Sequence, residues 1–266
     1  MKIKYTKFAF VAFLAISMLI PLSMGFGIDG VTFIKEVSPG QELVHNITVS
    51  NDVNASTLNM TAEVYGFARN LGGVNIALSP ENDTGTYTAR PFLSVEPKSF
   101  QLGPGERKTL HLTGTVPEDI GPGGKYALVV INTEPKITNG ISISTAIQAD
   151  VMLFVKGTEP IQTGEITDLS ASKSDEGVTV NLICKNTGNI YYKPLVGALL
   201  KSENGDILAN EEPKQIDSSI LPTNLRLCKV NLVPKTSLAP GTYTVEAKVT
   251  KEDGTLLDSK ETTFTV

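Results

Sequence analysis

Hydrophobic and polar residues alternate with a period of two along much of this 266-residue chain. The stretch from Leu58 to Val64 alternates in this way, and the longest such pattern runs from Ile141 to Val155. Successive side chains of a strand point to opposite faces, so each pattern predicts a strand, and the longest predicts one closing strand of its domain. Helical periodicity is nearly absent, and Gly, Pro, Asn and Asp separate the runs. The chain is therefore predicted to be all-β.

One phrase of the chain occurs twice. A strand pattern ends in Val-Pro, a short linker leads to Pro-Gly, and a Tyr opens the next strand pattern, at Tyr126 in the first copy and at Tyr243 in the second. The distance between the copies is too long for a solenoid unit and suits a β-sandwich of roughly 100 residues. In each copy we expect the Tyr to pack inward while its hydroxyl bonds backbone at the corner.

The repeat predicts two tandem immunoglobulin-like β-sandwich domains after a signal peptide. We place the signal peptide at residues 1–25, the first sandwich at residues 26–157 and the second at residues 158–266. The boundary falls at Gly157, where the longest alternating pattern runs into Thr-Glu-Pro.

The N-terminus has the order of a secretory signal. Basic residues precede an apolar run over residues 8–20, and small residues follow at 23–25. A retained membrane anchor is the alternative, but the run is short of the roughly 20 apolar residues that span a bilayer. We therefore expect signal cleavage, no membrane span in the mature chain, and a secreted protein of the cell envelope or cell surface.

The chain carries 23 Lys and Arg residues against 28 Asp and Glu residues, a formal net charge of −5. This acidic, evenly mixed composition lacks the basic surface of nucleic-acid-binding proteins, so we expect no nucleic-acid partner. Neither His45 nor His111 has a Cys or carboxylate at metal-ligand spacing, and no nucleophile elbow or phosphate loop occurs. We therefore predict no catalytic residue, no metal, no cofactor and no enzyme activity.

The two cysteines of the chain, Cys184 and Cys228, both belong to the second domain. Each shares the apolar face of its strand pattern, and in an immunoglobulin-like sheet those strands are antiparallel neighbours with both sulfurs at the same height. An even cysteine count in an exported protein favours a disulfide, worth roughly 4 kcal/mol on the chain-entropy model. The alternative is a pair of buried thiols, because neighbouring-strand geometry is tight for a bridge.

Four Asn-X-Ser/Thr sequons lie in the first domain, and the second domain has none. They are candidate N-glycosylation sites on predicted strands and turns, and would make the protein a glycoprotein. Chance is the alternative origin of the sequons, and many bacteria never use this signal. The asparagines are Asn46, Asn54, Asn59 and Asn82.

The stretch Phe92-Leu-Ser-Val-Glu-Pro97-Lys-Ser-Phe100-Gln-Leu-Gly-Pro104-Gly105, continued through Val116-Pro117 to Tyr126, resembles two protein groups. One is the N-terminal domain of periplasmic pilus chaperones, and the other opens the WxL-interacting, cell-wall-associated proteins of Gram-positive bacteria. The resemblance covers Val31 to Val155 and implies a two-domain immunoglobulin-like protein. The chain departs from both groups, because it lacks the Arg-Pro-type ending of the chaperone strand and the C-terminal membrane anchor of the WxL-interacting proteins.

Two functions are compatible with these features. The first is a secreted, non-catalytic envelope protein, for example an adhesion protein, that binds a surface polymer or surface protein through sandwich edges and loops. The second is a periplasmic-type chaperone for pilus or surface-fibre subunits that acts by donor-strand pairing. In the alternative arrangement the same strand completes its own sandwich, and a secreted hydrolase is a third class without a motif. The candidate donor residues are Ile141, Ile143, Ile147, Val151 and Leu153.

Overall fold

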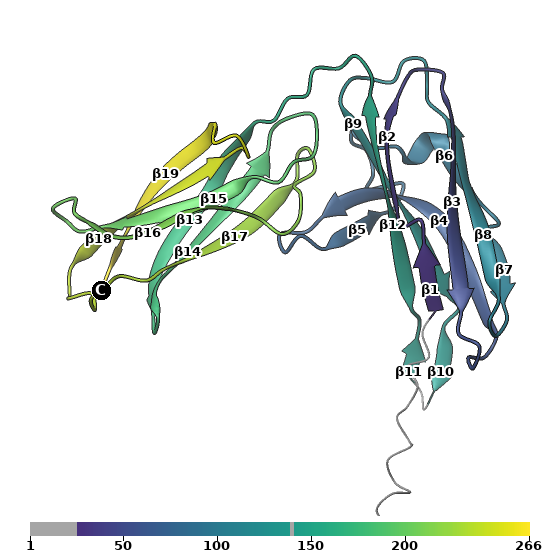
Figure 1. Ribbon diagram of the computed structural model, residues 1–266, viewed down its shortest axis with the longest axis horizontal. Coiled ribbons are helices and arrows are strands. Elements are labelled where there is room, and N and C mark those ends of the chain that lie inside the picture. The colour runs from purple at the N-terminus through teal and green to yellow at the C-terminus, as the bar shows by residue number, and fades with distance from the viewer. Residues whose placement is uncertain (1–25, 139–140) are drawn as a thin grey trace, which may run out of the picture.

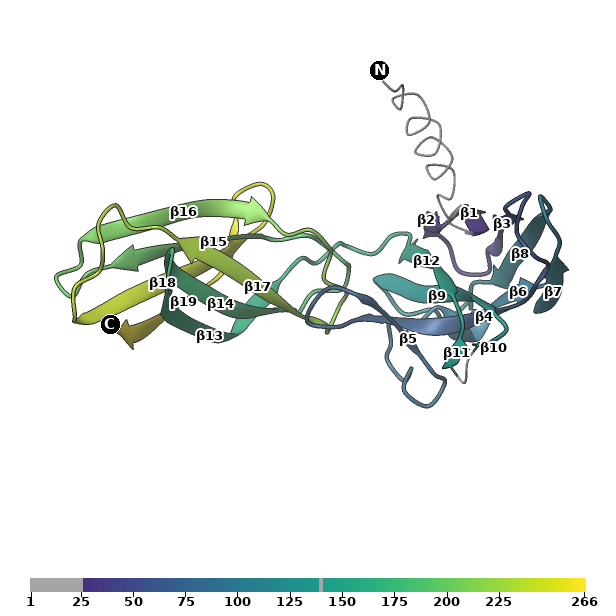
Figure 2. The same cartoon turned by 90° about the horizontal axis from the view of Figure 1, so that it is seen from below.

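The computed structural model of the protein describes residues 26–138 and 141–266, and the predicted signal peptide lies outside them. The described chain is built of β-strands and one short 3-10 helix, η1 (Arg90–Phe92), which confirms the predicted fold class. Two β-sandwiches lie side by side and are joined by a linker (Figure 1). Seen from below, they extend along one axis (Figure 2). No helix among the described residues is long and apolar enough to cross a membrane.

The first domain packs two sheets against each other. One has the strand order β1-β3-β8-β6, and the other has the order β2-β12-β9-β4-β5, with β7 paired to β4. Ile47, Leu110 and Ile131 are fully buried between them. The strands of this domain are β1 (Phe26–Asp29), β2 (Thr32–Val37), β3 (Glu42–Asn51), β4 (Leu58–Arg69), β5 (Asn75–Leu78), β6 (Leu93–Glu96), β7 (Ser99–Leu102), β8 (Arg107–Thr115), β9 (Gly124–Thr133), β10 (Lys136–Thr138), β11 (Ile141–Ile143) and β12 (Ala146–Val155).

The first two strands divide one extended segment between the two sheets. β1 pairs antiparallel with β3, whereas β2 pairs parallel with the second half of β12, from Asp150 to Val155. Gly30 lies at the crossing with a φ of 77°, and a Cβ atom there would collide with the carbonyl oxygen of Asn46. Glycine is therefore required where the chain changes sheets.

The second domain is a sandwich of the same kind with fewer strands. A sheet of order β13-β14-β17 faces a sheet of order β16-β15-β18-β19. Its core begins at Ile166, whereas the core of the first domain ends at Val155, so each domain has its own apolar interior. The strands are β13 (Gly164–Ser174), β14 (Gly177–Asn186), β15 (Leu195–Lys201), β16 (Ile207–Gln215), β17 (Leu225–Leu232), β18 (Thr242–Thr250) and β19 (Leu256–Thr265).

The two copies of the repeated phrase place their tyrosines on opposite faces. Tyr243 packs inward with Val245, and its hydroxyl donates to the carbonyl oxygen of Ala239 at 2.8 Å, as the sequence predicts. Tyr126 instead points to the outer face of its sheet, where its oxygen accepts the Tyr191 N–H of the second domain at 2.8 Å. The predicted inward packing is therefore wrong for the first copy.

A difference of one residue in the turn explains this reversal. Gly124 and Lys125 separate the first Pro-Gly from Tyr126, whereas Thr242 alone separates the second Pro-Gly from Tyr243. Because side chains alternate along a strand, a shift of one residue moves a side chain to the other face. The tyrosine of the second copy thus closes a corner within its own domain, whereas the tyrosine of the first copy contacts the neighbouring domain.

The alternating pattern from Ile141 to Val155 does not form one strand, contrary to the prediction. β11 turns back on β10, and β12 begins only at Ala146. Between them, Ser144 Oγ donates to the carbonyl oxygen of Thr133 at 2.7 Å, and the Thr145 N–H donates to Thr133 Oγ1 at 3.0 Å. Side-chain bonds of this kind compete with ladder bonds and interrupt the strand.

Glu246 on β18 is held between two lysines on the outer face of the second domain. Lys201 Nζ lies 2.8 Å and Lys248 Nζ 2.9 Å from its carboxylate oxygens. Hydrogen bonds from these two lysines lower the pKa of Glu246 to about 2. A carboxyl group whose pKa is lower in the folded state stabilises the fold at neutral pH, and this stabilisation is lost as the pH falls from about 4.5 toward about 2.

We expect Glu246→Gln to reduce the free energy of unfolding by about 1 kcal/mol at pH 7, because the ion pairs are partly solvated. Near pH 2 most of this difference should be gone, since Glu246 is then protonated in the unfolded state and about half protonated in the folded state. Urea denaturation at the two pH values measures this difference. An equal loss at both values would show that the side chain acts through packing instead.

Candidate functional site

Half of β12 is an open sheet edge. The strand pairs with β9 from Ala146 to Phe154, but β2 covers its other side only from Asp150 onward. The Asp150 N–H donates to the carbonyl oxygen of Val31 at 2.7 Å, so even-numbered residues of this strand direct their backbone groups away from β9. The N–H and C=O groups of Ala146 and Gln148 therefore point outward, where no strand of the described chain pairs with them.

The β10–β11 hairpin lies next to this edge and projects from the end of the first domain (Figure 1). Ile137, Ile141 and Ile143 of the hairpin are 78%, 64% and 57% exposed. Ile137 is paired with Ser142, so it lies on the opposite face from Ile141 and Ile143. Ile141 and Ile143 therefore form a short apolar strip on one face of the hairpin, next to the open half of β12, and Ile137 is exposed on the other face.

The five candidate donor residues fall into two groups. Val151 and Leu153 are each 1% exposed and belong to the core of the first sandwich, in the half of β12 that β2 covers. These two side chains complete the chain's own sandwich, which corrects their assignment to a donor strand. Ile141 and Ile143 are exposed, and Ile147 is half-buried in the open half of β12. Only these three can contact a partner without unfolding the domain.

A cleft of about 540 Å³ separates the two domains on the outer face of β2 and β12. Apolar and aromatic side chains, among them Ile34, Met152 and Tyr191, make up part of its lining. Lys35 and Lys193 line it from the first and the second domain. The cleft is therefore a second concave surface of mixed apolar and charged character.

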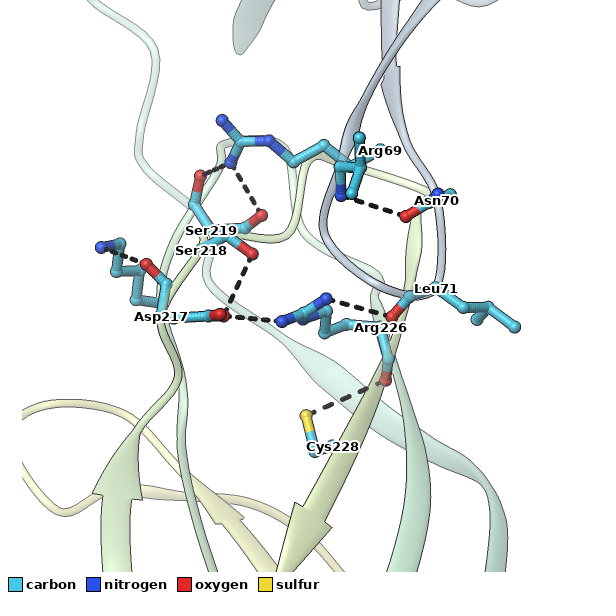
Figure 3. A network of polar contacts seen from close by, with 10 residues as sticks. Arg69, Asn70, Leu71, Asp217, Ser218, Ser219, Arg226 and Cys228 are labelled. Atoms are coloured by element: carbon cyan, nitrogen blue, oxygen red, sulfur yellow. Dashed lines mark hydrogen bonds and ion pairs between the residues drawn. The ribbon is translucent and has the colours of Figure 1, made fainter. Parts of the chain in front are cut away.

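Arg69, the last residue of β4, joins the two domains (Figure 3). Its Nη1 donates to the carbonyl oxygen of Ser219 at 2.9 Å, and its Nε donates to Asn75 Oδ1 at 3.0 Å. Its Nη2 lies 3.4 Å from the carboxylate of Asp150 on β12. Burial raises the pKa of Asp150 above its ordinary value, although Arg69 and Asn75 act in the opposite direction. One guanidinium thus ties β4, β5 and β12 to the second domain.

The tip of the β4–β5 hairpin adds a second set of contacts between the domains. The carbonyl oxygen of Leu71 accepts the Leu227 N–H at 2.9 Å and Arg226 Nη1 at 3.1 Å (Figure 3). Arg226 Nη2 also donates to Asp217 at 2.6 Å. The hairpin therefore makes a backbone bond to β17, the edge strand of the second domain's three-stranded sheet.

Cys184 and Cys228 lie on the neighbouring strands β14 and β17, and both are free thiols in the structure. They are not directly opposite each other, because Cys184 faces Arg226 and Cys228 faces Leu182 across the strand pair. The two sulfurs are therefore offset diagonally by two residues, and the prediction that they lie at the same height is wrong. The disulfide itself stays a prediction.

All four sequon asparagines are exposed on the first domain. Three of them make side-chain hydrogen bonds: Asn46 with His111 at 2.9 Å, Asn59 with Glu134 at 2.8 Å and Asn82 with Ser79 at 3.1 Å. Asn54 lies in the loop between β3 and β4. Glycosylation of these four asparagines stays a prediction.

Residues 26–138 and 141–266 contain no group of three or more His, Cys, Asp and Glu side chains that could hold a metal ion. The two histidines lie on opposite faces of the sheet that contains β3 and β8, because His45 pairs with buried Leu112 and His111 pairs with exposed Asn46. His45 Nε2 lies 2.9 Å from the carbonyl oxygen of Gly30, and its ring stacks on Phe33 at 4.6 Å. His45 thus supports the crossing from β1 to β2, and His111 bonds Asn46 on the neighbouring strand.

The contacts between the domains were not anticipated from the sequence. The available signal is the run from Tyr126 to Ile131, which is apolar throughout and does not alternate. A strand of that kind is typical of burial on both faces. In the structure, the inner face of β9 lies in the sandwich core, and its outer face packs with Leu221 and Tyr191 of the second domain.

The chain matches no protein-family model and no curated protein. Among solved structures, it is similar to the class 5 fimbriae chaperone CfaA, with 16% sequence identity and a TM-score of 0.40 over 90% of this chain and 98% of that chain. It is similar to a chain of the Salmonella enterica complex of SafA pilin with the SafB chaperone, with 12% identity and a TM-score of 0.40 over 91% and 97%. It is also similar to the E. coli chaperone DraB, with 12% identity and a TM-score of 0.38 over 90% and 96%. Similarity at this level carries no argument about function.

Proposed function

We propose that this chain is an exported, non-catalytic protein of the cell envelope that binds an extended segment of a partner protein by adding it as a strand to the open half of β12. The observation that supports this most directly is the pair of outward-facing residues, Ala146 and Gln148, whose backbone groups have no neighbouring strand in the described chain. Exposed edges of this kind pair with other chains unless they are covered.

The chemistry of the edge favours a polypeptide over a wall polymer. Backbone N–H and C=O groups at strand spacing are complementary to another strand, and main-chain bonds supply affinity while alternate side chains supply specificity. Ile141, Ile143 and Ile147 would contact the apolar side chains of the added segment. A pilus or fibre subunit that lacks a strand is one partner of this type, and an envelope surface protein with an unpaired strand is another.

The function is tested by blocking the edge without disturbing the sandwich. Gln148→Pro removes an outward-facing N–H, and the ladder to β9 is kept because it uses the odd-numbered residues of β12. Gln148→Ala is the matched control, because it shortens the side chain and keeps the N–H. The probe is an array of nine-residue peptides with alternating apolar and polar residues, beside the same peptides interrupted by a central proline.

We expect the parent protein and Gln148→Ala to bind the alternating peptides and not to bind the peptides interrupted by a central proline. Gln148→Pro should bind at least about tenfold more weakly, since the loss of one hydrogen bond and the obstruction by the ring together cost more than about 1.4 kcal/mol. Fluorescence anisotropy gives the dissociation constants. Equal binding by all three proteins, or binding of envelope polysaccharide in place of every peptide, would rule out strand addition at β12.

A further inference from the structure

A groove lies between the edge strands of the second domain, and Cys228, which is 6% exposed, is the cysteine that lines it. β16 and β17 are the outer strands of their sheets, and a groove of about 490 Å³ runs between them. Cys228 and Val230 belong to its lining, together with charged residues such as Lys214 and Arg226. Cys184, on the central strand of its sheet, does not line the groove. A reagent that enters the groove therefore meets Cys228 first.

The surroundings of the two sulfurs make them chemically unequal. A hydrogen bond with the Cys184 thiol lowers the pKa of Cys228, and nearby Arg226 acts in the same direction, whereas burial and Asp217 act in the opposite direction. The same contact, together with burial, raises the pKa of Cys184. The thiolate is the nucleophile of thiol chemistry, so ionisation favours the same cysteine that lines the groove.

We infer that Cys228 and Cys184 form a thiol–disulfide exchange site, which is entered through Cys228 from the β16–β17 groove and which takes a small-molecule disulfide as its substrate. In the first step the Cys228 thiolate attacks one sulfur of the disulfide, whose S–S bond breaks and releases one thiolate. In the second step Cys184 gives up its proton and attacks Cys228 Sγ, which releases the second thiolate. Two electrons pass from the cysteine pair to the reagent, and both released thiolates take up protons to become thiols.

Closing this disulfide requires β17 to move. Diagonal partners on antiparallel strands have Cα atoms about 7–8 Å apart, whereas disulfides usually join Cα atoms less than about 7 Å apart. Cys228 follows Leu227 and Arg226, and Cys228 Sγ lies 3.9 Å from the Arg226 carbonyl oxygen (Figure 3). Leu227 and Arg226 are the two residues that bind Leu71 of the first domain. Oxidation of the pair is therefore expected to loosen a contact between the domains.

The test uses the full chain, reduced with a phosphine and then exposed to bis(2-hydroxyethyl) disulfide without denaturant. Cys184→Ser should trap one hydroxyethylthio adduct on Cys228, whereas Cys228→Ser should react at least tenfold more slowly at Cys184. The parent protein should end as an intramolecular disulfide without adduct. Mass spectrometry of intact protein and of peptides follows these products. In the unsubstituted protein, alkylation with iodoacetamide should label Cys228 at least tenfold faster than Cys184, which keeps the test valid if a variant fails to fold.

Hydrogen exchange reports the link to the first domain. In the oxidised parent protein, the Leu227 amide should exchange at least tenfold faster than in the reduced protein. Equal reaction rates at the two cysteines, or a native disulfide that resists reduction until the protein is denatured, would overturn the exchange site. Unchanged exchange at Leu227 after oxidation would overturn its coupling to the domain contact.

Discussion

Arg69→Ala is expected to lower the free energy of unfolding by about 3 kcal/mol at pH 7, because removal of one member of a largely buried ion pair leaves the other without compensation. The side chains of Arg69 and Asp150 are only 11% and 20% exposed. The Ser219 carbonyl oxygen, which accepts from Arg69 at 2.9 Å, also loses its donor. We expect the same variant to loosen the arrangement of the domains, which small-angle X-ray scattering would record as a larger radius of gyration.

The loss of unfolding free energy caused by Arg69→Ala should be smaller at acidic pH. Burial already raises the pKa of Asp150, and removal of the guanidinium raises it further, because Arg69 favours the ionised carboxylate. The folded variant therefore binds the Asp150 proton more tightly than the unfolded chain does, and it regains stability relative to the parent as the pH falls through this raised pKa. At pH 3 we expect a loss of about 1–2 kcal/mol, mainly from the unpaired Ser219 carbonyl. Urea denaturation at both pH values measures the change.

Asp150→Asn provides the matched control. The amide keeps the shape of the side chain and removes its charge, so the double variant Arg69→Ala/Asp150→Asn should be more stable at pH 7 than Arg69→Ala alone. Additive losses from the two substitutions would mean that the two side chains act independently. Because Asp150 is also the first residue of β12 that β2 covers, the comparison shows whether the domain contact supports the strand that carries the open edge.

The alternation of side chains was enough to predict the fold class, since a period of two specifies strands wherever one face is buried. The alternation could not predict where the pairing of a strand with its neighbours ends. The pattern from Ile141 to Val155 is uninterrupted in the sequence, and the break at Ser144 and Thr145 depends on bonds to Thr133, which lies on another strand. The difference between exposed Ile143 and buried Val151 is therefore a matter of tertiary contacts, because both residues fit the same alternating pattern.

Register limits the prediction of the cysteine site in the same way. Strand neighbours follow from the fold, so Cys184 and Cys228 could be assigned to adjacent strands from the sequence. Their diagonal offset depends on how β14 slides against β17, and the sequence pattern is the same after any slip by two residues. The charged contacts of Arg69 could not be predicted from the sequence either, because a single Arg at the end of a strand pattern gives no indication of a partner on the second domain.

Tyr126→Ala is expected to cost about 4 kcal/mol, because the ring is 3% exposed and its removal leaves a cavity among Leu128, Met152 and Leu221. These residues come from both domains, so the cavity opens in the contact between them. Tyr126→Phe keeps the ring and removes only the oxygen that accepts the Tyr191 N–H at 2.8 Å. That substitution should cost about 1–2 kcal/mol, the penalty for a buried donor without an acceptor.

The second copy of the repeat supplies the control within the same molecule. Tyr243→Phe removes a hydroxyl that donates to Ala239 inside the second domain, so it should reduce the stability of that domain by a similar 1–2 kcal/mol. The radius of gyration should increase for Tyr126→Ala and stay at the parent value for Tyr243→Phe. If both variants leave the radius unchanged while losing stability, the outward-facing tyrosine stabilises its own sheet and does not hold the two domains together. In that case the extra residue in the first turn changes only which face of the sheet the tyrosine packs on, and has no effect on how the two domains are held together.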